Sequence, residues 1–176
     1  RYLALARSCE KLRNMYNSKW YYPTKGDDVV LSSLEEVLDE AMTYKGTILK
    51  DRYALQAARA MFTLKKYVEI IDWWAKIRND VQDEAIRKCI QGYVAGALFQ
   101  TGNEEKALEY YTSIGDIGSI VFCLKKRKDY KGDKTMLEYL SYHFPDNPYV
   151  HSLLQEYISS LEVYSDYFQE NGTTEA

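Results

Sequence analysis

Two histidines and three cysteines are the side chains of this sequence best suited to bind a transition metal or to act as general base or nucleophile. His143 and His151 stand on either side of a proline-containing turn, and neither has ligand spacing with Cys123 or with nearby acids. Cys9 and Cys89 are distant from each other and from Cys123, and the chain has no C-x-x-C pair. The sequence therefore predicts no metal site and no disulfide framework, and it favours the cysteines as small buried core residues.

Other motifs of catalysis are also missing. The sequence has no glycine-rich phosphate loop, no nucleophile elbow and no zinc-protease helix. The basic run at residues 125–128 could contact phosphates, but at the end of a predicted helix it also favours the negative end of the helix dipole. We expect a protein that is not an enzyme and that needs no cofactor.

Length and charge point to an ordinary globular chain. It has 176 residues and a net charge of −3, so we expect neither nucleic-acid binding nor, without a long apolar stretch, a membrane span. The chain begins at Arg1, already inside a helical pattern, which indicates a piece of a longer protein whose other domains are candidate partners. Nothing in the sequence indicates a cellular compartment.

Helix signals fill almost the whole chain. Prolines occur only at positions 23, 145 and 148, and alternating β-branched runs are absent. Ser32 with Glu35 has the form of a capping box, Gly102 and Gly115 stand where helices end, and Asn147 precedes a proline. These signals predict nine helices, at about residues 2–18, 32–46, 51–64, 67–78, 79–101, 103–115, 116–128, 134–144 and 148–170, followed by a polar tail at 171–176.

The central helices repeat at an offset of 37 residues. Each matched pair keeps its size class or its turn role: Ala58 with Ala95, Met61 with Leu98, Lys65 with Gly102, Ile70 with Ala107, Trp74 with Tyr111, and Ile77 with Ile114. Such a repeat predicts helix pairs that bury their apolar faces by stacking.

The spacing Ala95-x-x-Leu98-x-x-x-Gly102-x-x-x-x-Ala107-x-x-x-Tyr111-x-x-Ile114 resembles the tetratricopeptide-repeat family, best over residues 51–115. The other copy has Lys65 at the glycine position, and Ser119 stands where the family has a closing proline. The resemblance implies an all-α superhelix of stacked antiparallel helix pairs over residues 1–170, with a long C-terminal helix as its cap.

The resemblance also implies a protein-interaction module that binds a peptide or partner helix on its concave face. Carried over by position, that face would bear Arg52, Arg59, Phe62 and Phe99, with Gln56 and Tyr93 at its edge. Arginines beside large apolar groups are typical of binding anchors, so the partner would have an apolar stripe and some acidic character.

Two other interpretations stay open. The repeats could serve as an architectural spacer in a larger assembly protein, with no ligand groove of their own. A site built across several helices, which sequence patterns would miss, would instead make the chain an enzyme. The concave face could also be filled by another part of this chain.

Gly92 and Gly96, which share one side of a predicted helix, indicate close approach by another backbone, from a neighbouring helix or from a ligand.

Overall fold

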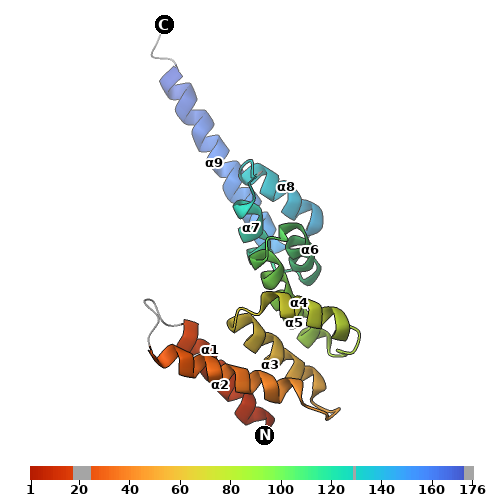
Figure 1. Cartoon of the computed structure of the whole chain (residues 1–176). Coiled ribbons are helices and arrows are strands. Elements are labelled where there is room, and N and C mark those ends of the chain that lie inside the picture. Colours follow the sequence, from red (N-terminus) through yellow and green to blue (C-terminus); the bar gives the residue numbers. More distant parts are fainter. Residues whose placement is uncertain (18–24, 129, 173–176) are drawn as a thin grey trace. The chain divides into compact units, whose positions relative to one another are not determined.

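A computed structural model describes the backbone of residues 1–17, 25–128 and 130–172, and the side chains of 1–15, 33–128 and 130–162. Throughout this part of the chain the regular elements are α-helices, which confirms the all-α prediction (Figure 1). The described helices are α1 (Tyr2–Asn17), α2 (Lys25–Met42), α3 (Lys50–Thr63), α4 (Tyr67–Ile77), α5 (Glu84–Gln100), α6 (Glu104–Ile114), α7 (Ile117–Lys126), α8 (Asp133–His143) and α9 (Pro148–Gly172).

The chain divides into two compact units, Arg1–Asp116 and Ile117–Ala176. The sequence prediction of one domain over residues 1–170 stays a prediction. Between the first two predicted helices, the sequence predicts a loop at residues 19–31; residues 19–24 lie outside the described part of the chain, and 25–31 are helical and belong to α2. Of the predicted tail, residues 173–176 lie outside the described part, and 171–172 belong to α9.

The N-terminal unit contains α1 to α6, and consecutive helices pack on one another. Helix α3 contacts α1, α2, α4 and α5, and α5 contacts α3, α4 and α6 (Figure 1). One apolar cluster joins these helices, with Cys9, Tyr53, Ile70, Trp74 and Ile90 among its buried side chains. Helices α3 and α5 therefore lie at the centre of the unit, because both of their sides are covered by other helices.

Three helix ends in this unit have the same hydrogen-bonded form. After α3, the amides of Lys65 and Lys66 donate to the carbonyls of Phe62 and Met61. The same pair of bonds closes α5 around Gly102 and closes α6 around Gly115. In each case the residue at the turn is left-handed, with φ of 58° at Lys65, 82° at Gly102 and 74° at Gly115. The predicted turn role of these three positions is confirmed.

The 37-residue offset is also kept by the helix boundaries. Helix α4 spans 67–77 and α6 spans 104–114, and α3 and α5 end at 63 and 100. The paired residues share their surroundings: Ala58 and Ala95 are fully buried, as are Ile70 and Ala107. Sequence matches at this offset therefore correspond to equivalent positions in the fold.

Several predicted helix starts are wrong. Helix α2 begins at Lys25, so Ser32 lies inside it and cannot be its cap; acidic residues 27 and 28 favour the earlier start. Helix α5 is capped by Asp83, whose carboxylate accepts from the amide of Ile86, and not by Asn79 or Asp80. At α3 and α8 the predicted caps Asp51 and Asp133 lie within the first helical turn. The sequence pattern identifies the polar residues near each helix start, but it does not show which of several neighbouring polar residues caps the helix.

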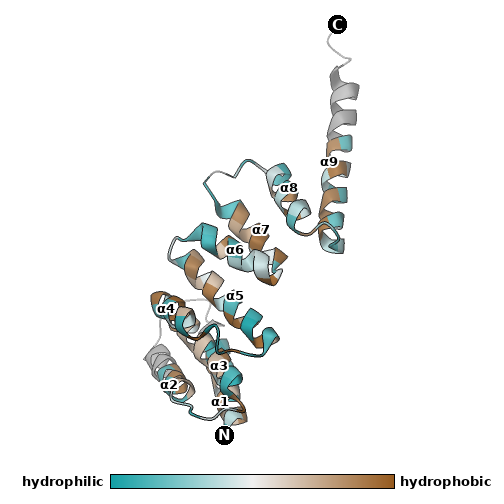
Figure 2. Cartoon of the chain, turned by 90° about the vertical axis from the view of Figure 1, so that its right-hand side faces the viewer, coloured by the Kyte–Doolittle hydropathy of each residue, from teal (hydrophilic) through white to brown (hydrophobic). Residues whose placement is uncertain are grey.

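The C-terminal unit contains α7, α8 and α9. Helix α8 contacts both of the others, and buried side chains from all three include Ile120, Cys123, Leu140 and Val150. Helix α9 begins as predicted, because the Asn147 side chain accepts from the amides of Tyr149 and Val150. Figure 2 shows hydrophobic and hydrophilic residues alternating along the described part of α9. Among these, Ile158 and Leu161 are half exposed.

Candidate functional site

The six predicted binding residues lie on α3 and α5. Arg52 is exposed, Arg59, Phe62, Tyr93 and Phe99 are partly exposed, and Gln56 is buried. Phe62, Tyr93 and Phe99 all pack against the same apolar cluster. Arg52 and Arg59 are seven residues apart, or two turns, so they share one face of α3.

Helix α1 packs beside this face and contributes a residue that the sequence prediction missed. The guanidinium carbon of Arg13 lies 5.7 Å from the centre of the Tyr93 ring, which is within range of a cation–π contact. Across α3, the Phe62 ring lies 5.6 Å from Tyr93. We use the term arginine–aromatic face for Arg13, Arg52, Arg59, Phe62, Tyr93 and Phe99.

Arg13 was missed because α1 carries no copy of the repeat motif. A signal was nevertheless present in the sequence. Arg13 stands four residues after Cys9, which belongs to the apolar stripe of the first helix, so both residues face the same neighbours.

Gln56 needs a correction, because it is not at the edge of an accessible surface. Its side chain is only 2% exposed, and its amide nitrogen donates to the hydroxyl of Tyr2 on α1, at 3.2 Å. Helix α1 therefore covers the part of α3 around Gln56. At this one position the predicted concave face is filled by another part of the chain.

Phe62 also explains one of the two glycines on α5. A Cβ atom placed on Gly96 would lie 2.8 Å from the Phe62 ring, closer than real Cβ contacts allow. Close approach is therefore confirmed at Gly96, but it comes from a side chain and not from a backbone. At Gly92 an added Cβ would meet only Ile114, at an ordinary 3.6 Å, so no close approach is needed there.

Three buried polar atoms in the described side chains have no hydrogen-bond partner, and all three belong to this region. They are Nε of Arg13, Oε1 of Gln56 and Nε of Arg59. Buried polar groups in proteins are nearly always hydrogen-bonded, so a group of exceptions calls for an explanation. Both arginines lie near the Cys9 thiol; burial raises the pKa of this thiol, and the two guanidinium charges partly oppose that rise.

The cysteines follow the prediction at two of three positions. Cys9 and Cys123 are buried, whereas Cys89 is exposed on α5. Cys89 shares one exposed side of that helix with Ala85 and Lys88. The expectation of a buried core residue is wrong at Cys89, because this side of α5 faces water, whereas Ile90 on another side of the helix is fully buried.

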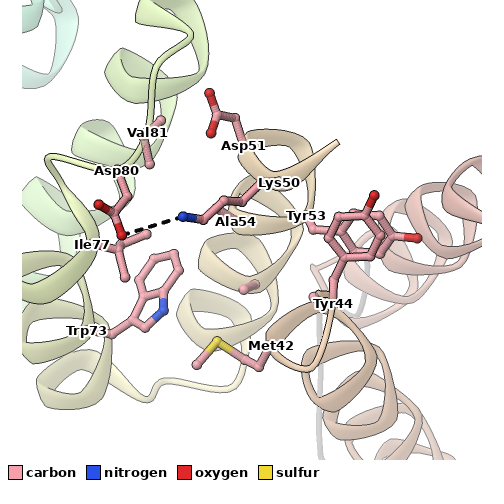
Figure 3. A pocket seen from close by; sticks show the side chains of 12 residues that line it. Met42, Tyr44, Lys50, Asp51, Tyr53, Ala54, Trp73, Ile77, Asp80 and Val81 are labelled. Carbon is pink, nitrogen blue, oxygen red and sulfur yellow. Dashed lines mark hydrogen bonds and ion pairs between the residues drawn. The ribbon is translucent and has the colours of Figure 1, made fainter. Parts of the chain in front are cut away.

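A separate cavity of about 130 Å³ lies between the ends of α2 and α4 and the start of α3 (Figure 3). Lys50 reaches across it to Asp80, with 3.5 Å between nitrogen and oxygen, and Met42 and Trp73 lie beneath this ion pair. Ala54 forms part of its lining. This cavity is on the opposite side of α3 from Arg52 and Arg59, because Ala54 falls half a turn away from both.

The charged groups at this cavity have structural partners. The Asp51 carboxylate accepts from the amides of Gln82 and Asp83, at 2.8 and 2.7 Å, and so ties the α4–α5 loop to the start of α3. Tyr44 and Tyr53 stack with their ring centres 3.8 Å apart. The arrangement explains how the loops are held, and it offers no nucleophile paired with a base.

Within the described residues, no group of three or more His, Cys, Asp or Glu side chains is placed to hold a metal ion. In that same part of the chain no helix combines the length and the apolar character needed to span a membrane.

Comparisons with models of protein families, with curated proteins and with solved structures gave no match to this chain.

Proposed function

We propose that the chain is a protein-interaction module of the tetratricopeptide-like kind, without catalytic activity, and that its arginine–aromatic face binds a peptide or a partner helix. The bound segment has large apolar side chains and acidic residues. Another protein, or another domain of the same longer chain, supplies it.

The packing of the N-terminal unit supports a tetratricopeptide-like arrangement. Helices α1, α3 and α5 contact one another in sequence, while α2, α4 and α6 each pair with the helix before them or after them. In this arrangement the first helices of the pairs form the concave side. The arginine–aromatic face consists of residues from those three helices.

The single observation that carries the proposal is the exposure of aromatic rings beside arginines that each keep one buried N–H donor without a hydrogen-bond partner. Phe62, Tyr93 and Phe99 are partly exposed although they are large, and Arg59 has a buried Nε with no partner. Aromatic and arginine side chains dominate the binding energy of protein interfaces.

A peptide-display selection against the whole chain tests the proposal. We expect amphipathic binders whose affinity falls at least tenfold with Arg59→Ala, while the fold is kept. Matched controls are Arg78→Ala, an exposed arginine of the same unit, and Phe122→Ala, an exposed aromatic of the C-terminal unit. Selection of no binder, or equal losses in the controls and in Arg59→Ala, would contradict this function.

One observation favours the architectural spacer as a second candidate. Helix α1 already covers Gln56, so part of the face is filled by the chain itself. If α1 covers the whole face in solution, as it covers Gln56, the repeats would only hold neighbouring domains apart. The selection described above separates the two functions, because a spacer yields no binder that depends on Arg59.

A further inference from the structure

We propose that Arg13 and Arg59 together form a carboxylate-binding subsite of the arginine–aromatic face, which takes an aspartate or glutamate side chain of the bound segment. This inference rests on the proposed function and adds the chemistry of one contact. Its occupant is an internal acidic residue of a partner that also presents an apolar side chain to Phe62 and Tyr93.

Two arginines, one on α1 and one on α3, each have a buried hydrogen-bond donor that is not used. The Nε atoms of Arg13 and Arg59 are buried and have no hydrogen-bond partner, although they come from different helices. The two guanidinium groups are near the same thiol, that of Cys9, which is fully buried between α1 and α3. The packing of α1 on α3 therefore leaves a buried, unpartnered donor on each helix, and both guanidinium charges act on the same thiol.

The guanidinium group of Arg59 has no ion-pair partner among the described carboxylates. By contrast, Arg1 and Lys50 have one partner each and Lys66 has two. Glu10, the residue after Cys9, also acts on the Cys9 thiol, and it is not an ion-pair partner of Arg59. The side chain that lies near both guanidiniums is a thiol, whose pKa is raised by burial and which therefore stays neutral. A carboxylate from outside would meet two cations in a partly dry setting, where charge-assisted hydrogen bonds are strong.

The shape of the arginine donors and the adjoining aromatic rings favours a carboxylate next to an apolar group. Arginine presents its donors as a planar fork that matches the two oxygens of a carboxylate. Arg13 is also held over the Tyr93 ring, which restricts the direction of its fork. Because aromatic rings adjoin the donors, a bound acidic residue must have an apolar neighbour, which a free inorganic anion lacks.

The test uses peptides from the selection with an acetylated amino end and an amidated carboxyl end, so that side chains supply every carboxylate. Each Glu or Asp is replaced in turn by Gln or Asn, and binding to the wild-type chain and to Arg59→Gln is measured. We expect one replacement to weaken binding to the wild type at least tenfold and to weaken binding to Arg59→Gln less than twofold. Such coupling identifies the acid that meets Arg59.

Arg78→Gln is the matched control, because Arg78 is an exposed arginine of the same unit and lies outside the arginine–aromatic face. Equal losses for wild type and Arg59→Gln at every acidic position, or binders without acidic residues, would overturn the subsite while the peptide-binding function stands. Binding that requires a free terminal carboxylate or a phosphate group would also overturn it.

A second variant separates the proposed subsite from a structural role of Arg59. Arg59→Met retains the apolar stem and removes the buried donor, so the urea midpoint of unfolding should stay equal or rise. A clear drop in that midpoint would show that Arg59 is structural, and the subsite would then be rejected together with the function.

Discussion

At the scale of single residues, a left-handed residue follows each of α3 and α5, and two arginines each keep a buried donor that lacks a hydrogen-bond partner. Lys65 occupies the left-handed turn position that glycine occupies at the equivalent place, Gly102. The sequence could predict the turn at both positions, because the repeat aligns them. It could not predict the unused donors of Arg13 and Arg59, since these depend on which side chains a distant helix brings near them.

Lys65→Gly should stabilise the N-terminal unit. A side chain at φ of 58° is strained, and glycine relieves this strain at some cost in chain entropy, so we expect a net gain of about 0.5–1 kcal/mol. Trp73 and Trp74 belong to this unit, and urea unfolding followed by tryptophan fluorescence measures the effect. Gly102→Ala should move stability in the opposite direction by a similar amount. A loss of stability in Lys65→Gly would count against the turn assignment.

Asp133 gives a pH prediction in the C-terminal unit. A hydrogen bond from the Tyr130 hydroxyl is the main cause that lowers the pKa of Asp133, and Lys125, 3.4 Å away, adds to it. The same bond raises the pKa of Tyr130 to about 12. Tyr130→Phe should therefore raise the pKa of Asp133 toward its usual value of about 3.9.

Because the folded pKa of Asp133 lies below its unfolded value, its contribution to stability is present above pH 4 or so and is lost as the pH falls through the folded pKa. Carboxyl NMR titration of wild type and Tyr130→Phe checks the shift. An unchanged titration of Asp133 in that variant would show that the hydroxyl does not set it.

At the scale of helices, seam residues were predictable and helix starts were less so. Ala58, Ala95 and Ala107 are fully buried, as their recurrence at helix contacts predicts. Helix ends marked by left-handed residues are also found where expected. Starts failed at α2 and α5, because several Asp, Asn and Ser residues in each stretch can cap a helix and only tertiary packing decides among them.

Ala95→Leu should destabilise the N-terminal unit by about 1–3 kcal/mol, because Ala95 is fully buried where helices meet and added methylenes overpack the contact. Ala85→Leu is the matched control, since Ala85 lies on the same helix and is exposed. The tryptophan-detected unfolding midpoint measures both variants. Equal midpoints for the two would mean that α5 does not make the close contact described.

Asp51→Ala should destabilise the same unit by about 1–3 kcal/mol, because it leaves the amides of Gln82 and Asp83 without their acceptor. Amide hydrogen exchange should accelerate in the α4–α5 loop before it does so in α3. Asp72→Ala, an exposed acid on α4, serves as the control. No change in exchange at residues 82 and 83 would contradict the role given to Asp51.

At the scale of the whole molecule, the sequence predicted helices throughout the described part, but it could not predict how the chain divides. The motif covers residues 51–115, which end almost where the first compact unit ends at Asp116. The candidate surface was predicted from α3 and α5 alone. Helix α1 adds Arg13 and covers Gln56, and both effects arise from contacts between helices far apart in the chain. The spacing from Cys9 indicates that Arg13 lies on the packed side of the first helix, but it does not show which side chains Arg13 meets there.

The most direct test of the central claim is Phe99→Ala measured in two ways, by affinity for a selected peptide and by the free energy of unfolding. Phe99 is partly exposed, so the account predicts at least a tenfold loss of affinity with a loss of stability below about 2 kcal/mol. A ring packed in a core would instead cost about 3–5 kcal/mol when truncated. Unchanged affinity together with a stability loss of that larger size would contradict the claim that this face binds a partner.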